Sequence, residues 1–279
     1  MSNEVSYNNV VEATVSILRK AETTLSEDVI EAIQKAKDGE SSTVAREQLN
    51  AILKNIDIAS RNKVPICQDT GILIFFVEIG RDLAIDFNLD AAIEEGVRKA
   101  TISIPLRPNS VDPLTRNNSK DNTGDGIPDI KYNFCDGNKL KITVAPKGAG
   151  SENMSAVKML NPTETDQIRN FVLETVLNAG GKPCPPIVIG IGIGGSFDKA
   201  ARLAKASLLE NMTDMNELEL SILKDVNSLG IGPMGLGGDT TALAVHMKKA
   251  HCHTASLPVA VNIQCWANRH ASIILGGEE

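Results

Sequence analysis

Cysteine is the residue type in this chain with the widest choice of chemistry, and its five copies are Cys67, Cys135, Cys184, Cys252 and Cys265. Three of them stand at the ends of predicted elements. Cys67 lies in PICQDTG, directly before the apolar run 72–79, Cys184 lies between two prolines, and Cys265 follows the apolar stretch 257–264. An odd number of scattered cysteines argues against a disulfide scaffold. Buried structural thiols, a metal site and a catalytic thiol remain as interpretations.

The wide spacing of these three thiols suits an iron–sulfur cluster better than zinc, because zinc sites usually contain a short C-x₂₋₄-C pair. Three thiolates on a four-iron cluster would leave one iron without a cysteine ligand. Spacing alone does not select this interpretation, since unmodified cysteine is also among the most frequently buried residue types. The sequence around each thiol has to decide.

A glycine-rich loop offers a competing chemistry. Residues 190–195, GIGIGG, follow a predicted strand and precede a predicted helix, so they match the G-x-G-x-x-G pattern of nucleotide-dependent dehydrogenases. That fold expects a second strand with an acidic residue about 20 positions later, whereas two helical segments come next here. An anion bound at the loop and tight packing of strand on helix are the other interpretations.

The elements that must position these residues indicate a mixed α/β fold. We expect one domain over 1–279, with a helical N-terminal region at 1–60 and an α/β region at 61–279 in which helices flank a mixed sheet and the site lies at strand and helix ends. Strands are predicted at 72–79, 139–146, 186–190 and 257–264. The segment 103–138 is rich in Pro, Asn, Asp and Gly and is predicted to be irregular. Within it, DNTGDG (121–126) begins like a calcium loop, but Tyr132 occupies the position of the required Glu, so a turn is expected.

The amino-acid composition argues against nucleic acid and membranes as partners of this protein. The chain is 42% hydrophobic and 23% charged with a net charge of −7, which gives no electrostatic footprint for nucleic acid. It shows no targeting segment and no apolar run near the roughly 18 residues that span a membrane. A cytoplasmic protein without nucleic-acid or membrane partners is therefore expected.

Six segments, taken in order, resemble the α subunit, or N-terminal domain, of the class I fumarate hydratase and L-tartrate dehydratase family. They are PICQDTG, LRPN, KGAGSENMS, CPPIVIGIGIGGSFDKAA, GIGPMGLGGDTTAL and HTASLPVAVNIQC, and the resemblance extends from about residue 10 to residue 275. It implies a hydro-lyase with a [4Fe–4S] cluster held by Cys67, Cys184 and Cys265, one iron being left without a cysteine ligand. Cys135, Cys252, His246 and His270 match no functional position and are expected to be structural.

The resemblance also implies a substrate site and a partner. Gln68, Arg107 and Gly150 are expected to bind a small dicarboxylate, and Asp69 and His253 to transfer protons. Arg107 stands between Pro105 and Pro108 and offers a planar guanidinium that matches a carboxylate. Gly150 would allow backbone N–H groups to approach a ligand closely. His253, taken alone, suits a structural role as well as a catalytic one.

The resemblance bears on the partner through the length of the chain. Single-chain members carry a further C-terminal domain that completes the active site, and this chain ends at Glu279 without it. We therefore expect a separate β subunit, without which the chain is inactive. Fumarate/(S)-malate is the first expected substrate pair, and L-tartrate/oxaloacetate is the alternative. A non-catalytic scaffold subunit remains a further interpretation.

Overall fold

The computed structural model describes residues 4–277, so residues 1–3 and 278–279 of the predicted 1–279 domain lie outside the described part. Its elements group into two compact units, and neither unit is continuous in sequence. The first unit consists of the chain up to Leu25, Ile56–Lys147 and the chain from Arg269 onward; the second consists of Ser26–Asn55 and Gly148–Asn268. The prediction of a single functional domain is not decided by this grouping. None of the described helices is long and apolar enough to cross a membrane.

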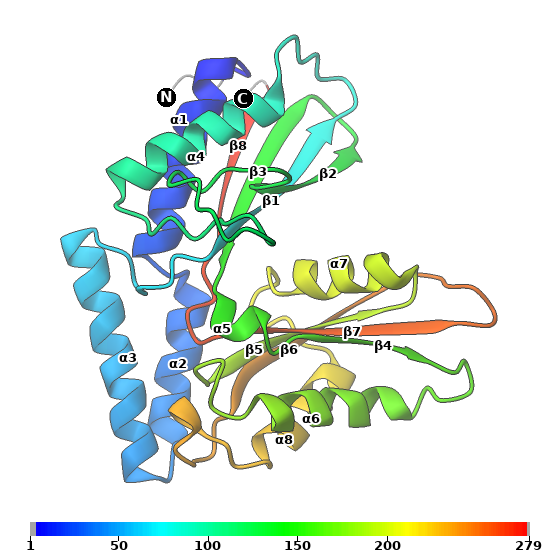
Figure 1. The fold of residues 1–279 in the computed structure, drawn as a ribbon. Coiled ribbons are helices and arrows are strands. Elements are labelled where there is room, and N and C mark those ends of the chain that lie inside the picture. The colour runs from blue at the N-terminus through cyan, green and yellow to red at the C-terminus, as the bar shows by residue number, and fades with distance from the viewer. Residues whose placement is uncertain (1–3, 278–279) are drawn as a thin grey trace. The chain divides into compact units, whose positions relative to one another are not determined.

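The first unit is a four-stranded mixed sheet covered by two helices. The strand order is β2-β1-β3-β8, in which β1 runs parallel to β2 and antiparallel to β3, and β3 runs antiparallel to β8. Helices α1 and α4 pack against each other, and α1 also contacts β3 and β8 (Figure 1). The bounds are α1 Tyr7–Thr23, β1 Ile72–Gly80, α4 Leu89–Ser103, β2 Asp129–Cys135, β3 Lys139–Lys147 and β8 Ala271–Gly276.

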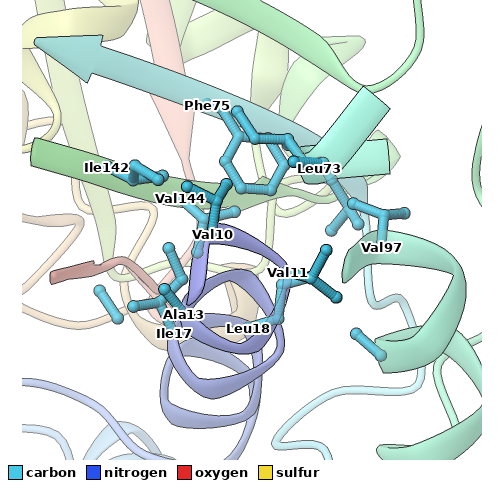
Figure 2. Close-up of a cluster of buried hydrophobic side chains, with 14 of the residues drawn as sticks. Val10, Val11, Ala13, Ile17, Leu18, Leu73, Phe75, Val97, Ile142 and Val144 are labelled. Atoms are coloured by element: carbon cyan, nitrogen blue, oxygen red, sulfur yellow. The ribbon is translucent and has the colours of Figure 1, made fainter. Parts of the chain in front are cut away.

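The core of this unit follows from the apolar periodicity of its elements. Side chains at helical spacing on α1 meet alternate side chains of β1 and β3, and Figure 2 shows Val10, Val11 and Leu18 of the helix beside Leu73 and Phe75 of the strand. Phe75 is fully buried. Burying one such side chain contributes about 1.5–3 kcal/mol, so this contact fixes α1 over the strand that follows Cys67.

The second unit is a three-layer arrangement around the sheet β4-β7-β5-β6. In it β5 runs parallel to β6, while β7 runs antiparallel to both β5 and β4. Helix α7 covers one face, and α6 and α8 cover the other (Figure 1). The bounds are α5 Ala149–Glu152, β4 Ala156–Leu160, α6 Gln167–Ala179, β5 Ile187–Ile193, α7 Phe197–Ser207, α8 Glu217–Asn227, β6 Ala242–Lys249 and β7 Leu257–Gln264. Helix α2, Glu27–Gly39, belongs to this unit, and α3 spans Thr43–Asn62.

The mixed α/β class and the N-terminal helices predicted from the sequence are confirmed. The fold contains two mixed sheets, whereas the sequence suggested one. The segment 103–138 is not wholly irregular either, because β2 lies within it and pairs with β1 from Ile74 opposite Asp129 to Gly80 opposite Cys135. Cys135 is therefore the last residue of an edge strand.

Candidate functional site

In the first unit Cys67 lies on a short turn that leads into β1. The Asp69 N–H donates to the Cys67 sulfur across 3.4 Å, and the Asp69 carboxylate accepts from the Gly71 N–H at 2.9 Å. Gly71 has a φ of +75°, and a Cβ there would lie 2.6 Å from the Lys147 backbone nitrogen, so only glycine fits. Cys67 is half-buried and Gln68 is exposed. The polar residues of PICQDTG thus form a turn that presents a thiol.

Arg107 is brought beside this turn. The Thr70 hydroxyl accepts from the Arg107 N–H at 3.1 Å and lies 3.3 Å from the Arg107 carbonyl. The Asn109 amide donates to the Thr70 hydroxyl at 3.2 Å, and the Asn122 amide donates to the Arg107 carbonyl at 3.1 Å. The guanidinium itself is on an exposed side chain. A rigid main chain with an exposed cation suits the binding of a carboxylate.

A buried ion pair lies behind the Cys67 turn. The Arg269 guanidinium donates to the Glu22 carboxylate at 2.7 Å and to the Asp69 carbonyl at 2.8 Å, and the exposed fractions of the two side chains are 1% and 0%. The Glu22 carbonyl also accepts from the Ile66 N–H at 2.8 Å. Burial raises the pKa of Glu22 to about 7, and the neighbouring Arg269 opposes that rise.

In the second unit Cys184 and Cys265 are connected through their main chains. The Trp266 N–H donates to the Cys184 carbonyl at 3.4 Å, which joins the residue after Cys265 to the connection that precedes β5. Cys184 is exposed and has a backbone φ of +56°, which is unusual for a residue other than glycine. An exposed thiol on an unusual backbone conformation between Pro183 and Pro185 does not fit the role of a cysteine that fills the core.

Gly150 is linked to the same region. Its neighbour Ser151 donates to the Gln264 side chain at 3.3 Å, and Gln264 donates in turn to the Ala267 carbonyl at 3.1 Å. Gly150 itself is exposed on α5, where a Cβ would meet only the Lys182 carbonyl, at 3.4 Å. The second unit therefore gathers Gly150, Cys184 and Cys265.

His253 does not lie with Gly150, Cys184 and Cys265. It lies in the exposed connection before β7, and its Nδ1 accepts from the Ala255 N–H at 3.1 Å. Cys265 directly follows the last residue of the same strand. Eight residues of strand at about 3.3 Å each place the two near opposite ends of a span of roughly 25 Å.

The GIGIGG segment is explained by packing. Gly190 and Gly192 lie within β5, and a Cβ at either position would come 2.0 Å from a backbone carbonyl of α7, that of Ala204 or Ala200. The glycines therefore allow the helix to lie close on the strand. Cys252 is exposed and His246 is buried in β6, where burial lowers its pKa. The DNTGDG segment forms the expected turn, with the Asp121 side chain accepting from the N–H and the hydroxyl of Thr123.

Sequence reasoning missed the residues that support the site. Four buried polar residues support it, namely Thr70, Asn122, Glu22 and Arg269. The side chains of Thr70, Asn122 and Arg269 bond to the main chain of Arg107 or Asp69, whereas Glu22 bonds to Ile66 through its own main chain and to Arg269 through its carboxylate. Thr70, Asn122 and Arg269 lie inside or next to segments that stand out in the sequence, which was the available signal. Glu22 lies within an amphipathic helix and gave none.

The three proposed cluster ligands are divided between the two units, and in each unit the cysteines have the chemistry that an iron–sulfur cluster requires. All five cysteines are thiols rather than disulfides, and the N–H donated to Cys67 is the kind of bond that stabilises a thiolate ligand. Within residues 4–277 no group of three or more His, Cys, Asp or Glu side chains is placed to hold a metal ion. Cys67 belongs to the first unit and the other two to the second, so ligation by all three remains a prediction.

Comparison with known proteins identifies the family. Residues 11–274 match the family model described as Fumarate hydratase (Fumerase). The chain is 50% identical over 273 residues to "Putative L(+)-tartrate dehydratase subunit alpha" of Methanocaldococcus jannaschii, an alignment that covers 94% of this chain and 96% of that protein. It is 30% identical to the L(+)-tartrate dehydratase subunit alpha of Escherichia coli O157:H7, with 98% of this chain and 93% of that protein covered. The chain belongs to the class I fumarate hydratase family of iron–sulfur hydro-lyases.

Proposed function

We propose that this chain is the α subunit of a two-subunit hydro-lyase that removes water from a 2-hydroxy dicarboxylate, with L-tartrate as the first candidate substrate. The observation that carries the proposal is the 50% identity, along nearly the whole of both chains, to a relative named as an L(+)-tartrate dehydratase α subunit. The sequence alone put fumarate/(S)-malate first, and the names of the relatives favour its alternative. Loss of water from L-tartrate gives an enol that tautomerises to oxaloacetate.

The (S)-malate/fumarate pair is the second candidate. The description of the matching family model supports it. The two substrates differ by one hydroxyl group, and the same residues would bind the two carboxylates that both possess.

The residues proposed to hold the cofactor are Cys67, Cys184 and Cys265, on a [4Fe–4S] cluster that has one iron without a cysteine ligand. When bound, such a cluster supplies a Lewis acid for a hydroxyl and a carboxylate oxygen of the substrate. The thiolate chemistry of all three residues, the N–H donated to Cys67 and the main-chain link between the other two support this assignment.

The chain's own side chains have distinct proposed roles. Arg107 holds one substrate carboxylate through a charge-assisted pair, and Gln68 and the backbone at Gly150 donate further hydrogen bonds. Asp69 holds or moves a proton, since its half-buried carboxylate is fixed by the Gly71 N–H next to Cys67. His253 is the second proposed proton-transfer residue. A dianion needs a second cation, and we propose that the β subunit supplies it together with the base that removes the C3 proton.

The test combines subunits and substrates. The α chain is reconstituted with iron and sulfide under argon, with and without the proposed β chain. L-tartrate dehydration is followed as oxaloacetate and (S)-malate dehydration as fumarate. We expect turnover only when both chains are present, with the higher kcat/KM for L-tartrate. A higher kcat/KM for malate would select the second candidate, turnover by α alone would refute the division of labour, and inactivity on every 2-hydroxy diacid would refute the hydro-lyase assignment.

A further inference from the structure

The Cys67 turn is held before the thiol by the main chain of Glu22 and after it by the side chain of Arg269, which forms a buried ion pair with Glu22. Before the thiol, the Ile66 N–H donates to the Glu22 carbonyl at 2.8 Å. After it, the Asp69 carbonyl accepts from Arg269 at 2.8 Å, and the same guanidinium donates to the Glu22 carboxylate at 2.7 Å. The Arg269 side chain, from the segment before β8, therefore links the turn to the Glu22 side chain of α1, and the Glu22 main chain bonds to the other side of the turn.

Stability alone is a poor explanation for such a pair. Removing two charges from water is expensive, and well-packed apolar residues of similar volume are often as stabilising or more so. Both side chains are almost wholly excluded from solvent, at 1% and 0% exposure. A guanidinium differs from any apolar substitute in one respect, since it can donate to a carboxylate and to a main-chain carbonyl simultaneously in fixed directions.

We propose that Glu22 and Arg269 are positioning residues that hold the Cys67–Asp69 turn in the conformation that presents the Cys67 thiolate to the cluster. The inference rests on the proposed cluster-binding role of Cys67. Glu22 orients the guanidinium, and the guanidinium fixes the Asp69 carbonyl. The peptide beyond that carbonyl leads to Thr70, whose hydroxyl is hydrogen-bonded to the main chain of Arg107, so the same contacts fix the spacing between the thiol and the proposed carboxylate-binding Arg107.

The experiment uses the αβ complex, purified without oxygen, and compares Arg269→Lys with the wild type. Lysine keeps the charge but lacks the planar fork, so it cannot reproduce both bonds. The matched control is Arg169→Lys, because Arg169 also joins a carboxylate, that of Asp225, to a second acceptor, the Ser221 hydroxyl at 2.6 Å, in the other unit. Circular dichroism selects the variants that fold.

Two readouts separate positioning from general stability. The first is the rate at which a chelator removes iron, expected to rise roughly 10- to 100-fold in Arg269→Lys and to stay unchanged in the control. The second is iodoacetamide labelling of the cluster-free complex, read by mass spectrometry as the ratio of Cys67 to Cys135. We expect that ratio to rise about tenfold, as for the loss of a hydrogen bond to a charged group.

An unchanged ratio in folded Arg269→Lys, or an equal increase in labelling at Cys67 and Cys135, would overturn the proposal. If Arg269→Lys does not fold, Glu22→Gln decides, because glutamine keeps an uncharged acceptor for Arg269. In Glu22→Gln the labelling of Cys67 relative to Cys135 should also rise, by a smaller factor than in Arg269→Lys. A labelling ratio equal to that of the wild type would again overturn the proposal. Should the wild-type complex contain no iron, the proposed cofactor would fail, and the labelling ratio would still test the positioning role.

Discussion

At the scale of single residues, Arg107 combines an immobilised main chain with an exposed cation. Thr70 and Asn122 bond to its backbone, and both are about 2% exposed, so water does not compete for these bonds. The substrate would then meet a clamp whose backbone is already ordered, and less conformational freedom is lost on binding.

Replacing Arg107 by Ala in the αβ complex should raise KM and lower kcat/KM roughly 10- to 150-fold, while the iron content stays at the wild-type level. The reason is the loss of a charge-assisted pair with the substrate, worth about 1.5–3 kcal/mol. Steady-state kinetics and an iron assay measure both effects. Arg81→Ala is the control, since Arg81 pairs with Asp136 on the surface. Wild-type kinetics in Arg107→Ala would show that this side chain does not touch the substrate.

Glu22 should make the stability of the cluster-free chain depend on pH. Its pKa is raised by burial to about 7, above its ordinary value of 4.5, so the folded state favours the protonated form. The stability from this group is fully present below 4.5 and is lost as pH rises toward and through 7. In Glu22→Gln that loss disappears. Thermal unfolding at about pH 5 and about pH 8 should show a smaller decrease in Tm for the variant than for the wild type; equal decreases would contradict the assignment.

At the scale of elements, the close approach of α7 to β5 depends on two glycines. Gly192→Ala would place a Cβ 2.0 Å from the Ala200 carbonyl, where backbone on both sides cannot easily move. We expect a destabilisation of about 1–3 kcal/mol or more, measured by chemical denaturation. Gly124→Ala is the matched control, because its Cβ would meet nothing within 4 Å. Equal stability of the two variants would mean that the helix is free to shift.

The same elements show which strands a sequence can predict. The runs that became β1 and β7 are almost continuously apolar, and β7 is buried along its whole length, so both are recognisable as central strands. The edge strands β2 and β4 mix half-buried and exposed positions, including exposed Phe134 and Met159, and depend on pairing with a neighbour. A local sequence pattern does not show which strand pairs with which, so β2, β4 and the second sheet were not predicted.

The candidate site was predictable in part for a similar reason. Cys67, Cys184 and Cys265 are flanked by prolines, glycines or the ends of apolar runs, and such termini can be read locally. Glu22 and Arg269 form an ion pair although they are 247 positions apart in the sequence, and no local sequence pattern near either residue predicts this contact. Long-range buried polar contacts of this kind become visible only once the chain is folded.

At the scale of the whole molecule, β7 separates two of the predicted site residues. If His253 transfers a proton in catalysis, it must serve a pocket other than that containing its own Cys265, because the strand holds them roughly 25 Å apart. Complexes carrying Cys265→Ser and His253→Asn should each be inactive, and mixing them under subunit exchange should restore part of the turnover. A mixture of Cys265→Ser with Cys184→Ser is the control and should stay inactive. Absence of recovery in the first mixture would remove His253 from this role.

The first unit contains segments from both ends of the chain, and this sets the order of events during biosynthesis. Cys67 is made early, whereas Arg269 and the strand β8, which pairs with β3, are made about two hundred residues later. At roughly 5–20 residues per second the thiol waits on the order of 10–40 s before its turn can be completed. Cofactor insertion would therefore follow synthesis of Arg269 and β8, and the nascent thiol would be open to oxidants in the meantime. In stalled ribosome complexes ending at Lys249, Cys67 should react with iodoacetamide as fast as in the unfolded chain, and it should become protected only once Arg269 and β8 have left the ribosome.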